Sequence, residues 1–370
     1  MLIETVSSKQ KQRIYIHTMK KQIILSLILF FTFLVSNAQV KINDNYNHNP
    51  ISNVKIFSKA GRILAFSNLK GIANISTVDF PKNDSIEIYH SNYVSQKMTW
   101  NDIIKSPQIY LNPDPVTKLD EVVLTAKNPE YLLLKGYFIS YQIIDDVAIS
   151  FSDGIIEYYI NLGKEKVIDA RIIESRTFKN TDYIKAFKER KGNSSFNVLS
   201  TVPPFNFKEE VLLSDWNKYK IYKGGVIKRK DDIIGRISND SNKTEFTIEY
   251  YSPQNTKKVS LFGITSVIKN KTIYEKFNST TPKVEEIAIL GKYYNSDITQ
   301  KGVTVNYELI EDFYTMEKKF LSKAKFKDYL SKKENEEQYN LYLGNKSFSV
   351  IPEYIELLLY NELDLISNPK

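Results

Sequence analysis

The feature that most constrains the fold is a pair of long β-rich runs near the middle of the chain. Residues 131–144 and 147–160 are dominated by aliphatic and aromatic side chains, and Asp145-Asp146 stands between them. Two such runs separated by two turn-forming residues are typical of a β-hairpin. We therefore predict long antiparallel strands in this part of the chain.

The remainder of residues 126–370 favours an antiparallel meander with a few helices. Further strand-like runs are residues 167–178, 218–226, 233–237, 245–251, 259–268, 287–294 and 303–314. Helical patterns cover residues 182–191, 325–336 and 352–363, and Pro352 suits the first turn of the last one. We predict a large antiparallel α+β domain over residues 126–370, preceded by a smaller domain, in a protein that is mainly β.

Residues 39–125 show shorter strand-like runs. They lie at residues 54–57, 63–66, 72–75, 85–89 and 108–111, after a weak first strand at residues 40–42. Clusters of Gly, Asn and Pro separate them. Short strands with this spacing are typical of a β-sandwich, which we predict for residues 39–125.

Five motifs in this region follow one another in a recognisable order: residues 50–54 (PISNV), 67–75 (SNLKGIANI), 84–88 (DSIEI), 109–113 (IYLNP) and 119–124 (LDEVVL). Together they resemble the carboxypeptidase-like regulatory domain, although Asn92 stands where that family usually has Gly. The resemblance implies a transthyretin-like, seven-stranded sandwich without catalytic residues. It also implies attachment to exported proteins of Gram-negative bacteria, such as TonB-dependent receptors. The residues after 125 are too few for the barrel of such a receptor.

Residues 1–38 have the pattern of a leader and signal peptide. Lys20-Lys21 precede a short apolar run over residues 23–35, and Ser36-Asn37-Ala38 offers a cleavage site between small residues. We predict a start at Met19, cleavage after Ala38 and export to the periplasm or the outer membrane. An uncleaved N-terminal anchor is the alternative, although the apolar run is short for a spanning helix. Lipid attachment at the cleavage point is excluded because the chain has no cysteine.

The charge balance depends on this leader. The formal net charge is +8, and residues 1–38 contribute half of it, with five basic residues against Glu4. A surplus of only +4 is left for residues 39–370, so we expect no binding of nucleic acid. Two Lys-rich stretches, residues 218–230 and 318–333, favour solvated faces, with peripheral contact to the outer membrane as the alternative.

The residue types that carry catalysis are scarce. The absence of cysteine excludes disulfides, thiolate metal sites and cysteine nucleophiles, and no two of the three histidines (His17, His48 and His90) have metal-ligand spacing. Adjacent carboxylates occur at 145–146, 209–210, 231–232, 285–286 and 311–312, but adjacency in sequence does not bring two carboxyl groups into a site. We predict no catalytic residue, no metal ligand and no cofactor, and the sequence identifies no ligand-binding residue.

Two further features of the sequence can be interpreted either as functional or as structural. Asp153-Gly154 lies inside a β run and favours a bulge or bend over a polar site. The tyrosines Tyr137, Tyr141, Tyr158 and Tyr159 favour packing over ligand binding. Long aromatic strands also fit a transmembrane barrel, against which the polar residues 364–370 argue.

Three functions are compatible with these observations. The first is an exported cell-envelope protein, not an enzyme, that binds or assembles with an unidentified envelope protein. The second is a carrier of an apolar ligand, by analogy with the half-barrel of lipoprotein carriers. The third is a hydrolase that uses carboxylates of the second domain.

Overall fold

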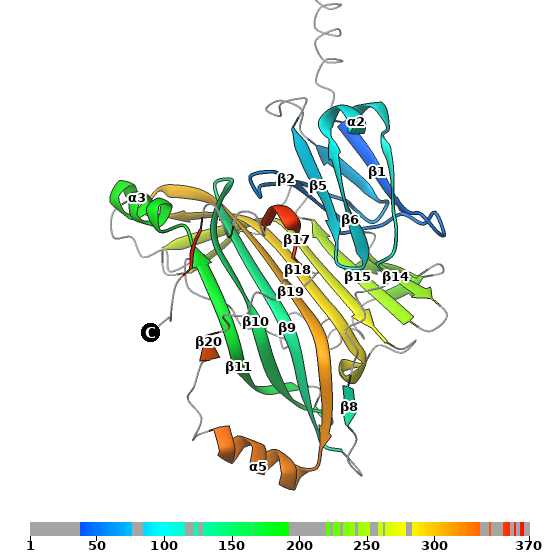
Figure 1. Ribbon diagram of the computed structural model, residues 1–370, viewed down its shortest axis with the longest axis vertical. Coiled ribbons are helices and arrows are strands. Elements are labelled where there is room, and N and C mark those ends of the chain that lie inside the picture. The colour runs from blue at the N-terminus through cyan, green and yellow to red at the C-terminus, as the bar shows by residue number, and fades with distance from the viewer. Residues whose placement is uncertain are drawn as a thin grey trace, which may run out of the picture.

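The computed structural model describes residues 38–75, 84–114, 122–124, 129–164, 166–191, 220–222, 225–229, 232–240, 243–251, 258–261, 263–278, 283–333, 340–341, 351–355, 359 and 363–365. The predicted leader, residues 1–38, lies outside these ranges except for Ala38. The protein is mainly β, with a small sandwich above a much larger sheet (Figure 1). This confirms the predicted fold class.

The sandwich consists of two sheets with seven strands in all. One sheet has the order β4-β1-β7 and the other β3-β2-β5-β6. Their bounds are β1 (Ala38–Asp44), β2 (Lys55–Ser58), β3 (Ile63–Phe66), β4 (Ile72–Ile75), β5 (Ser85–His90), β6 (Tyr93–Thr99) and β7 (Gln108–Leu111). Alternate side chains such as Ile42, Ile56 and Ile88 are fully buried between the sheets. The weak first strand at residues 40–42 is therefore real and central in its sheet.

Two elements of the sandwich were not predicted. The sequence of strand β6 alternates only weakly between apolar and polar residues, and helix α2 (Trp100–Lys105) has only six residues. The helix begins with a capping box: the Thr99 hydroxyl accepts from the Asp102 amide, and the Asp102 carboxylate accepts from the Thr99 amide. Thr-x-x-Asp before an apolar residue is a sequence signal for a helix start, so this helix was predictable.

The large sheet follows the order β12-β13-β14-β15-β17-β18-β19-β9-β10-β11-β20. Its first strands are β8 (Val122–Leu124), β9 (Tyr131–Ile144), β10 (Val147–Asn161), β11 (Lys166–Lys179), β12 (Lys220–Tyr222), β13 (Val226–Arg229) and β14 (Asp232–Asp240). The later ones are β15 (Lys243–Tyr251), β16 (Lys258–Leu261), β17 (Ile264–Phe277), β18 (Ile287–Gln300), β19 (Val303–Leu321), β20 (Asn340–Leu341) and β21 (Asp364–Leu365). The predicted hairpin is confirmed: β9 and β10 pair antiparallel around Asp145 and Asp146, which both have positive φ.

Two runs were each predicted to be a single strand, and this prediction is wrong because each run forms a hairpin of two strands. Residues 218–226 contain β12 and the first residue of β13, which pair antiparallel across Gly225. Residues 259–268 contain β16 and the start of β17, paired across a turn at Gly263. Gly263 has a φ of +76°, which glycine adopts without the cost that a side chain would add. A single glycine inside an apolar run was the signal for this turn.

The sandwich ends earlier than residue 125. Its last strand is β7, and the LDEVVL motif supplies β8, which pairs parallel to β19 of the large sheet. The motif that resembles the end of the regulatory domain therefore belongs, through β8, to the second sheet.

Helices are few, as expected. Helix α3 (Thr181–Lys191) corresponds to the prediction for residues 182–191, and α5 (Lys323–Lys333) to that for residues 325–336. A short 3-10 helix, η4 (Val284–Glu286), precedes β18. Of residues 352–363, the structure describes 353–355 and Leu359 as helical.

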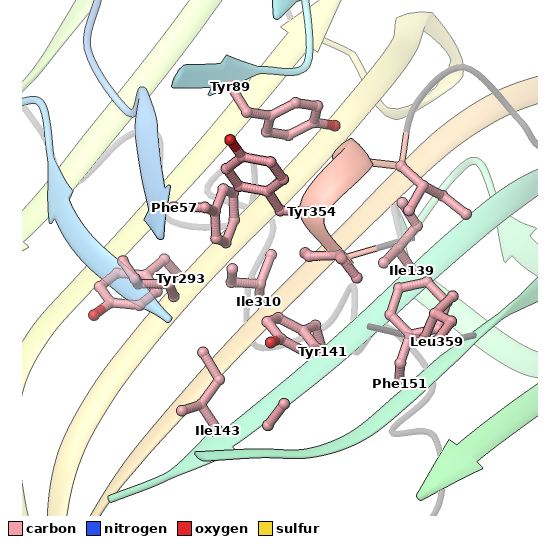
Figure 2. Close-up of a cluster of buried hydrophobic side chains, with 14 of the residues drawn as sticks. Phe57, Tyr89, Ile139, Tyr141, Ile143, Phe151, Tyr293, Ile310, Tyr354 and Leu359 are labelled. Atoms are coloured by element: carbon pink, nitrogen blue, oxygen red, sulfur yellow. The ribbon is translucent and has the colours of Figure 1, made fainter. Parts of the chain in front are cut away.

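Each face of the large sheet carries its own apolar cluster. On one face, side chains of β9, β10, β18 and β19 pack against Phe57 and Tyr89 of the sandwich and against Tyr354 and Leu359 of the closing segment, residues 351–355 with Leu359 (Figure 2). We call this the docked face. The opposite face, which we call the inner face, buries Leu134, Phe138, Tyr158, Leu290 and Phe313 in a second cluster.

Candidate functional site

The docked face of the large sheet is covered by the outer surface of one sandwich sheet, β3-β2-β5-β6. Along β2 and β5, Ile56 and Ile88 point into the sandwich, whereas Lys55, Phe57 and Tyr89 point to the large sheet. Period-two alternation along a strand explains how both surfaces become buried. The Phe66 ring continues this contact by stacking on Tyr293 of β18, with ring centroids 3.7 Å apart.

A buried ion pair lies at the centre of this junction. Lys55 Nζ is 3.5 Å from Asp312 Oδ2, and both side chains are almost fully buried. Burial raises the pKa of Asp312, and the Lys55 ammonium lowers it in part. Beside the pair, the hydroxyl groups of Tyr89 and Tyr314 lie 3.1 Å apart. Removal of either charge would leave its partner buried and uncompensated, so this pair fixes how the sandwich sits on the sheet.

A second polar group surrounds His90, at the end of β5. Its imidazole packs edge-on against Tyr93 and Tyr274, and its Nδ1 accepts a hydrogen bond from the Asn92 amide at 3.1 Å. The Asn92 side chain donates to the Tyr274 hydroxyl and accepts from Lys276 Nζ at 2.7 Å. Burial, then Lys55 and Lys276, lower the pKa of His90 well below its usual value. The imidazole is therefore neutral near pH 7.

The closing segment ties the C-terminal part of the chain to the sandwich. Glu87 of β5 accepts from the amides of Glu353 and Tyr354, at 3.0 and 2.8 Å. Lys97 pairs with Glu353, and the Tyr354 hydroxyl bonds to Ser85. Burial raises the pKa of Glu87 even though these two amides lower it. Figure 2 shows Tyr354 between Phe57 and Tyr89, so the segment fills the space between sandwich and sheet.

Asp153 is a further buried acid on the docked face. It accepts from the Tyr137 hydroxyl at 2.6 Å and from Arg176 Nε and Nη2 at 2.7 and 2.9 Å. Burial and the Asp153 carboxylate raise the pKa of Tyr137. The bulge or bend that we predicted at Asp153-Gly154 lies two residues later, as a shift of register between Ile155 and Ile156. Gly154 instead allows a close approach, because a Cβ there would lie 2.1 Å from the Glu174 carbonyl oxygen.

These acids bear directly on the hydrolase hypothesis. Asp312 and Asp153 both pair with Ile139 in the register, so they lie two strands apart, about 10 Å. That separation falls near the range of an inverting pair of carboxyls. Each carboxylate, however, is buried beneath side chains and bound by its own cation, Lys55 or Arg176. The arrangement stabilises the junction and offers a substrate no carboxyl group.

The other adjacent acids are dispersed. Glu311 points to the inner face, opposite to Asp312, and bonds to Lys292 Nζ at 3.0 Å. Asp145 and Asp146 form the β9–β10 turn, Glu285 and Glu286 lie in η4, and Asp232 begins β14. Glu209, Glu210 and Asp231 lie outside the described residues.

The inner face combines an apolar cluster with a polar row. Ile227 of β13 belongs to the same buried cluster as Tyr158 of β10, although six strands separate β13 from β10 in the sheet order. The sheet therefore curves toward this face. Across its middle runs a row of register partners, Thr177, Ser152, Ser140, Glu311 and Lys292, one on each of five neighbouring strands. Beyond the row, helix α3 covers a third apolar cluster through Phe187.

The predicted packing residues lie as follows. Tyr137, Tyr141, Tyr158 and Tyr159 are all buried to 1% exposure or less, with Tyr137 and Tyr141 on the docked face and Tyr158 on the inner face. Tyr159 packs with Phe326 of α5. The four therefore do not converge on one site. Of the Lys-rich stretches, α5 displays exposed lysines, while Lys318 is buried in β19.

Sequence reasoning missed Lys55 and Glu87, the charged residues of the sandwich at the junction, and Arg176, which pairs with Asp153 within the large sheet. A charged residue between apolar neighbours in a short strand, as in residues 54–57 and 86–89, was the available signal. Within the described ranges, no three His, Asp or Glu side chains form a group that could hold a metal ion. No helix in the described part of the chain is long and apolar enough to cross a membrane.

Comparisons of the chain with protein-family models, with curated proteins and with solved structures gave no match.

Proposed function

We propose that the chain is an exported cell-envelope protein that works by binding or assembly and not by catalysis. The observation that carries this proposal is the junction: the buried Lys55–Asp312 pair joins the sandwich to the large sheet, and Glu87 joins it to the closing segment. Groups that are buried, paired and remote from solvent serve a fixed geometry better than a reaction. A fixed pair of β domains suits the presentation of surfaces to other envelope proteins.

Export is the first part of the proposal to test. The full chain would be produced with a C-terminal tag in a Gram-negative host, and the cell fractions would be analysed by N-terminal sequencing and immunoblotting. We expect a mature chain that begins at Gln39 in the periplasmic or outer-membrane fraction. Replacement of Ala38 by a large residue, Ala38→Arg, should retain the leader. A full-length chain in the cytoplasm would contradict export.

Assembly is the second part. Formaldehyde cross-linking in intact cells should join the mature protein to one or a few envelope proteins that are released when the cross-link is reversed by heat. The variant to compare is Lys55→Met, which disturbs the junction and replaces no exposed residue. Loss of the cross-linked partner in this variant would show that the fixed geometry matters. A protein that cross-links to nothing but shows hydrolytic turnover would refute the proposal.

A carrier of an apolar ligand is the second candidate, and the inner face favours it. The curved sheet there combines an apolar cluster with hydroxyl groups and the Lys292–Glu311 pair, a mixture suited to a ligand with an apolar body and a polar end. Native mass spectrometry before and after organic extraction should then show a released mass. Ser140→Trp, on the inner face, should abolish it, whereas Ile168→Trp, at an exposed position, should not. The same mass in both variants would remove this candidate.

A further inference from the structure

The sandwich also has an exposed surface, on the side that does not pack on the large sheet. Three segments meet there: residues 45–49 after β1, residues 94–96 in β6 and residues 108–113 around β7. None of the three contains a charged residue, although a quarter of the residues in the chain are charged. We call these segments the neutral tip. In Figure 1 the dark-blue loop after β1 forms the right-hand edge of the sandwich.

The neutral tip presents aromatic rings to solvent. Tyr46 is 89% exposed and Tyr110 is 38% exposed, and His48 packs edge-on against Tyr110 with ring centroids 5.5 Å apart. Along β7, Ile109 and Leu111 point into the sandwich core, so Tyr110 points out of the three-stranded sheet. The four-stranded sheet of the sandwich is the one that packs on the docked face of the large sheet. The fold therefore leaves the Tyr46 ring and part of the Tyr110 ring accessible to a ligand.

Hydrogen bonds hold this tip in one conformation. The buried Asp44 carboxylate accepts from the amides of Tyr46 and Asn47, at 2.7 and 3.0 Å, and from the Tyr93 hydroxyl at 2.8 Å. The Asn45 side chain donates to that of Asn112 at 2.8 Å, which joins the loop to β7. A surface whose backbone is already ordered loses little conformational freedom when a ligand binds.

The chemistry of the tip is that of rings bordered by amides. Asn45, Asn47, Asn49, Gln96, Gln108 and Asn112 lie among the aromatic residues. An amide both donates and accepts hydrogen bonds, which matches a hydroxyl group, and an aromatic face packs against C–H groups of positive partial charge. A pyranose ring offers both, with hydroxyl groups at its rim and C–H groups on its faces. A lipid headgroup or nucleic acid would instead require cations within the surface, whereas the three segments contain none and the exposed Lys41 and Lys97 only flank them.

We propose that the neutral tip of the sandwich binds an uncharged polysaccharide, with Tyr46 and Tyr110 as stacking platforms and the neighbouring amides as hydrogen-bonding groups. This site is separate from both faces of the large sheet. It requires neither a protein partner nor an apolar ligand.

Affinity electrophoresis tests the proposal. The mature chain would be run in native gels that contain soluble starch, hydroxyethyl cellulose, arabinoxylan or galactomannan, with polygalacturonate as the charged control. We expect retardation by at least one neutral polymer and none by polygalacturonate. Titration calorimetry with the matching hexasaccharide would then give the affinity.

Variants show whether the tip is responsible. Tyr46→Ala and Tyr110→Ala should each weaken binding at least ten-fold, while the exposed β11 position Ile168→Ala should leave it unchanged. Because Tyr46 is so exposed, its variant should keep the urea midpoint of the parent chain, which excludes misfolding as the cause. Absence of retardation in all four neutral polymers would overturn the proposal. So would equal retardation by polygalacturonate, or binding that survives both tyrosine substitutions.

Discussion

The two faces of the large sheet are buried by different means. The docked face combines its large apolar cluster with charged pairs and tyrosine hydroxyls that connect three separate parts of the chain, with Lys55 and Asp312 at the centre. The inner face is closed mainly by aliphatic and aromatic side chains such as Leu290 and Phe313. Apolar contacts are non-directional, whereas buried charges tolerate one geometry. The comparison teaches that the docked face defines the position of the sandwich, and the inner face supplies apolar stabilisation.

The largest expected effect comes from breaking the ion pair of the docked face. Lys55→Met leaves the Asp312 carboxylate buried without its cation, and we expect a loss of about 3–5 kcal/mol in the free energy of unfolding. Urea denaturation followed by fluorescence would measure it. The double variant Lys55→Met/Asp312→Leu removes both charges and should recover most of the loss. If the double variant is no more stable than the single one, the pair does not determine the docking.

A cavity on the inner face should lower the free energy of unfolding somewhat less than the loss of the ion pair does. Leu290 is buried to 1% exposure, and Leu290→Ala removes apolar contacts without leaving a charge, so we expect a loss of roughly 3 kcal/mol. The matched control Leu290→Met conserves volume and should cost less than about 1.5 kcal/mol. Equal losses in the two variants would show that polar contacts, and not packing, dominate the inner face.

Two tyrosines on β9 sharpen the comparison within the docked face. The Tyr137 hydroxyl donates to the Asp153 carboxylate, whereas that of Tyr141 donates to the Gly61 carbonyl oxygen at 3.0 Å. Hydrogen bonds to charged groups contribute more than neutral ones. We expect Tyr137→Phe to lower stability by about 2 kcal/mol and Tyr141→Phe by about 1 kcal/mol, measured by the same urea denaturation. The reverse order would mean that the Asp153 cluster carries less stability than its geometry indicates.

The smallest expected effect concerns pH. Because the native pKa of His90 lies well below 6.5, the unfolded chain binds a proton near pH 6 that the native protein does not. Stability from this residue is therefore complete well above pH 6.5 and is lost progressively as pH falls below it. Glu87, Glu308 and Asp312, whose pKa values are raised, act in the opposite sense.

A single variant separates these contributions. His90→Phe keeps a ring between Tyr93 and Tyr274 but cannot be protonated. The free energy of unfolding, measured by urea denaturation at pH 7.5 and pH 5.5, should therefore fall less on acidification in this variant than in the parent chain. An identical pH dependence in parent and variant would show that His90 is exposed to solvent.

The strands were largely predictable from the sequence, and the junction was not. Residues 131–144 and 147–160 carry a periodic apolar pattern with a two-residue turn, a local signal that survives folding. The runs around Gly225 and Gly263 were misread because the glycine in each was not recognised as the point where the chain reverses. Lys55 and Asp312 are 257 residues apart, and nothing in the neighbourhood of either residue indicates the other. Glu311 and Asp312, though adjacent, point to opposite faces, as any two neighbours on a strand must.

The contact between Glu87 and the closing segment has a consequence for the order in which the chain can fold. Glu87 belongs to the first quarter of the sequence, yet the amides that it binds lie 266 and 267 residues later. During synthesis or translocation the sandwich emerges long before these amides do. Its charged outer sheet must then remain hydrated until the last part of the chain arrives, because only that part completes the burial. A truncation just before Ile351 would therefore stall maturation at the N-terminal domain, far from the cut.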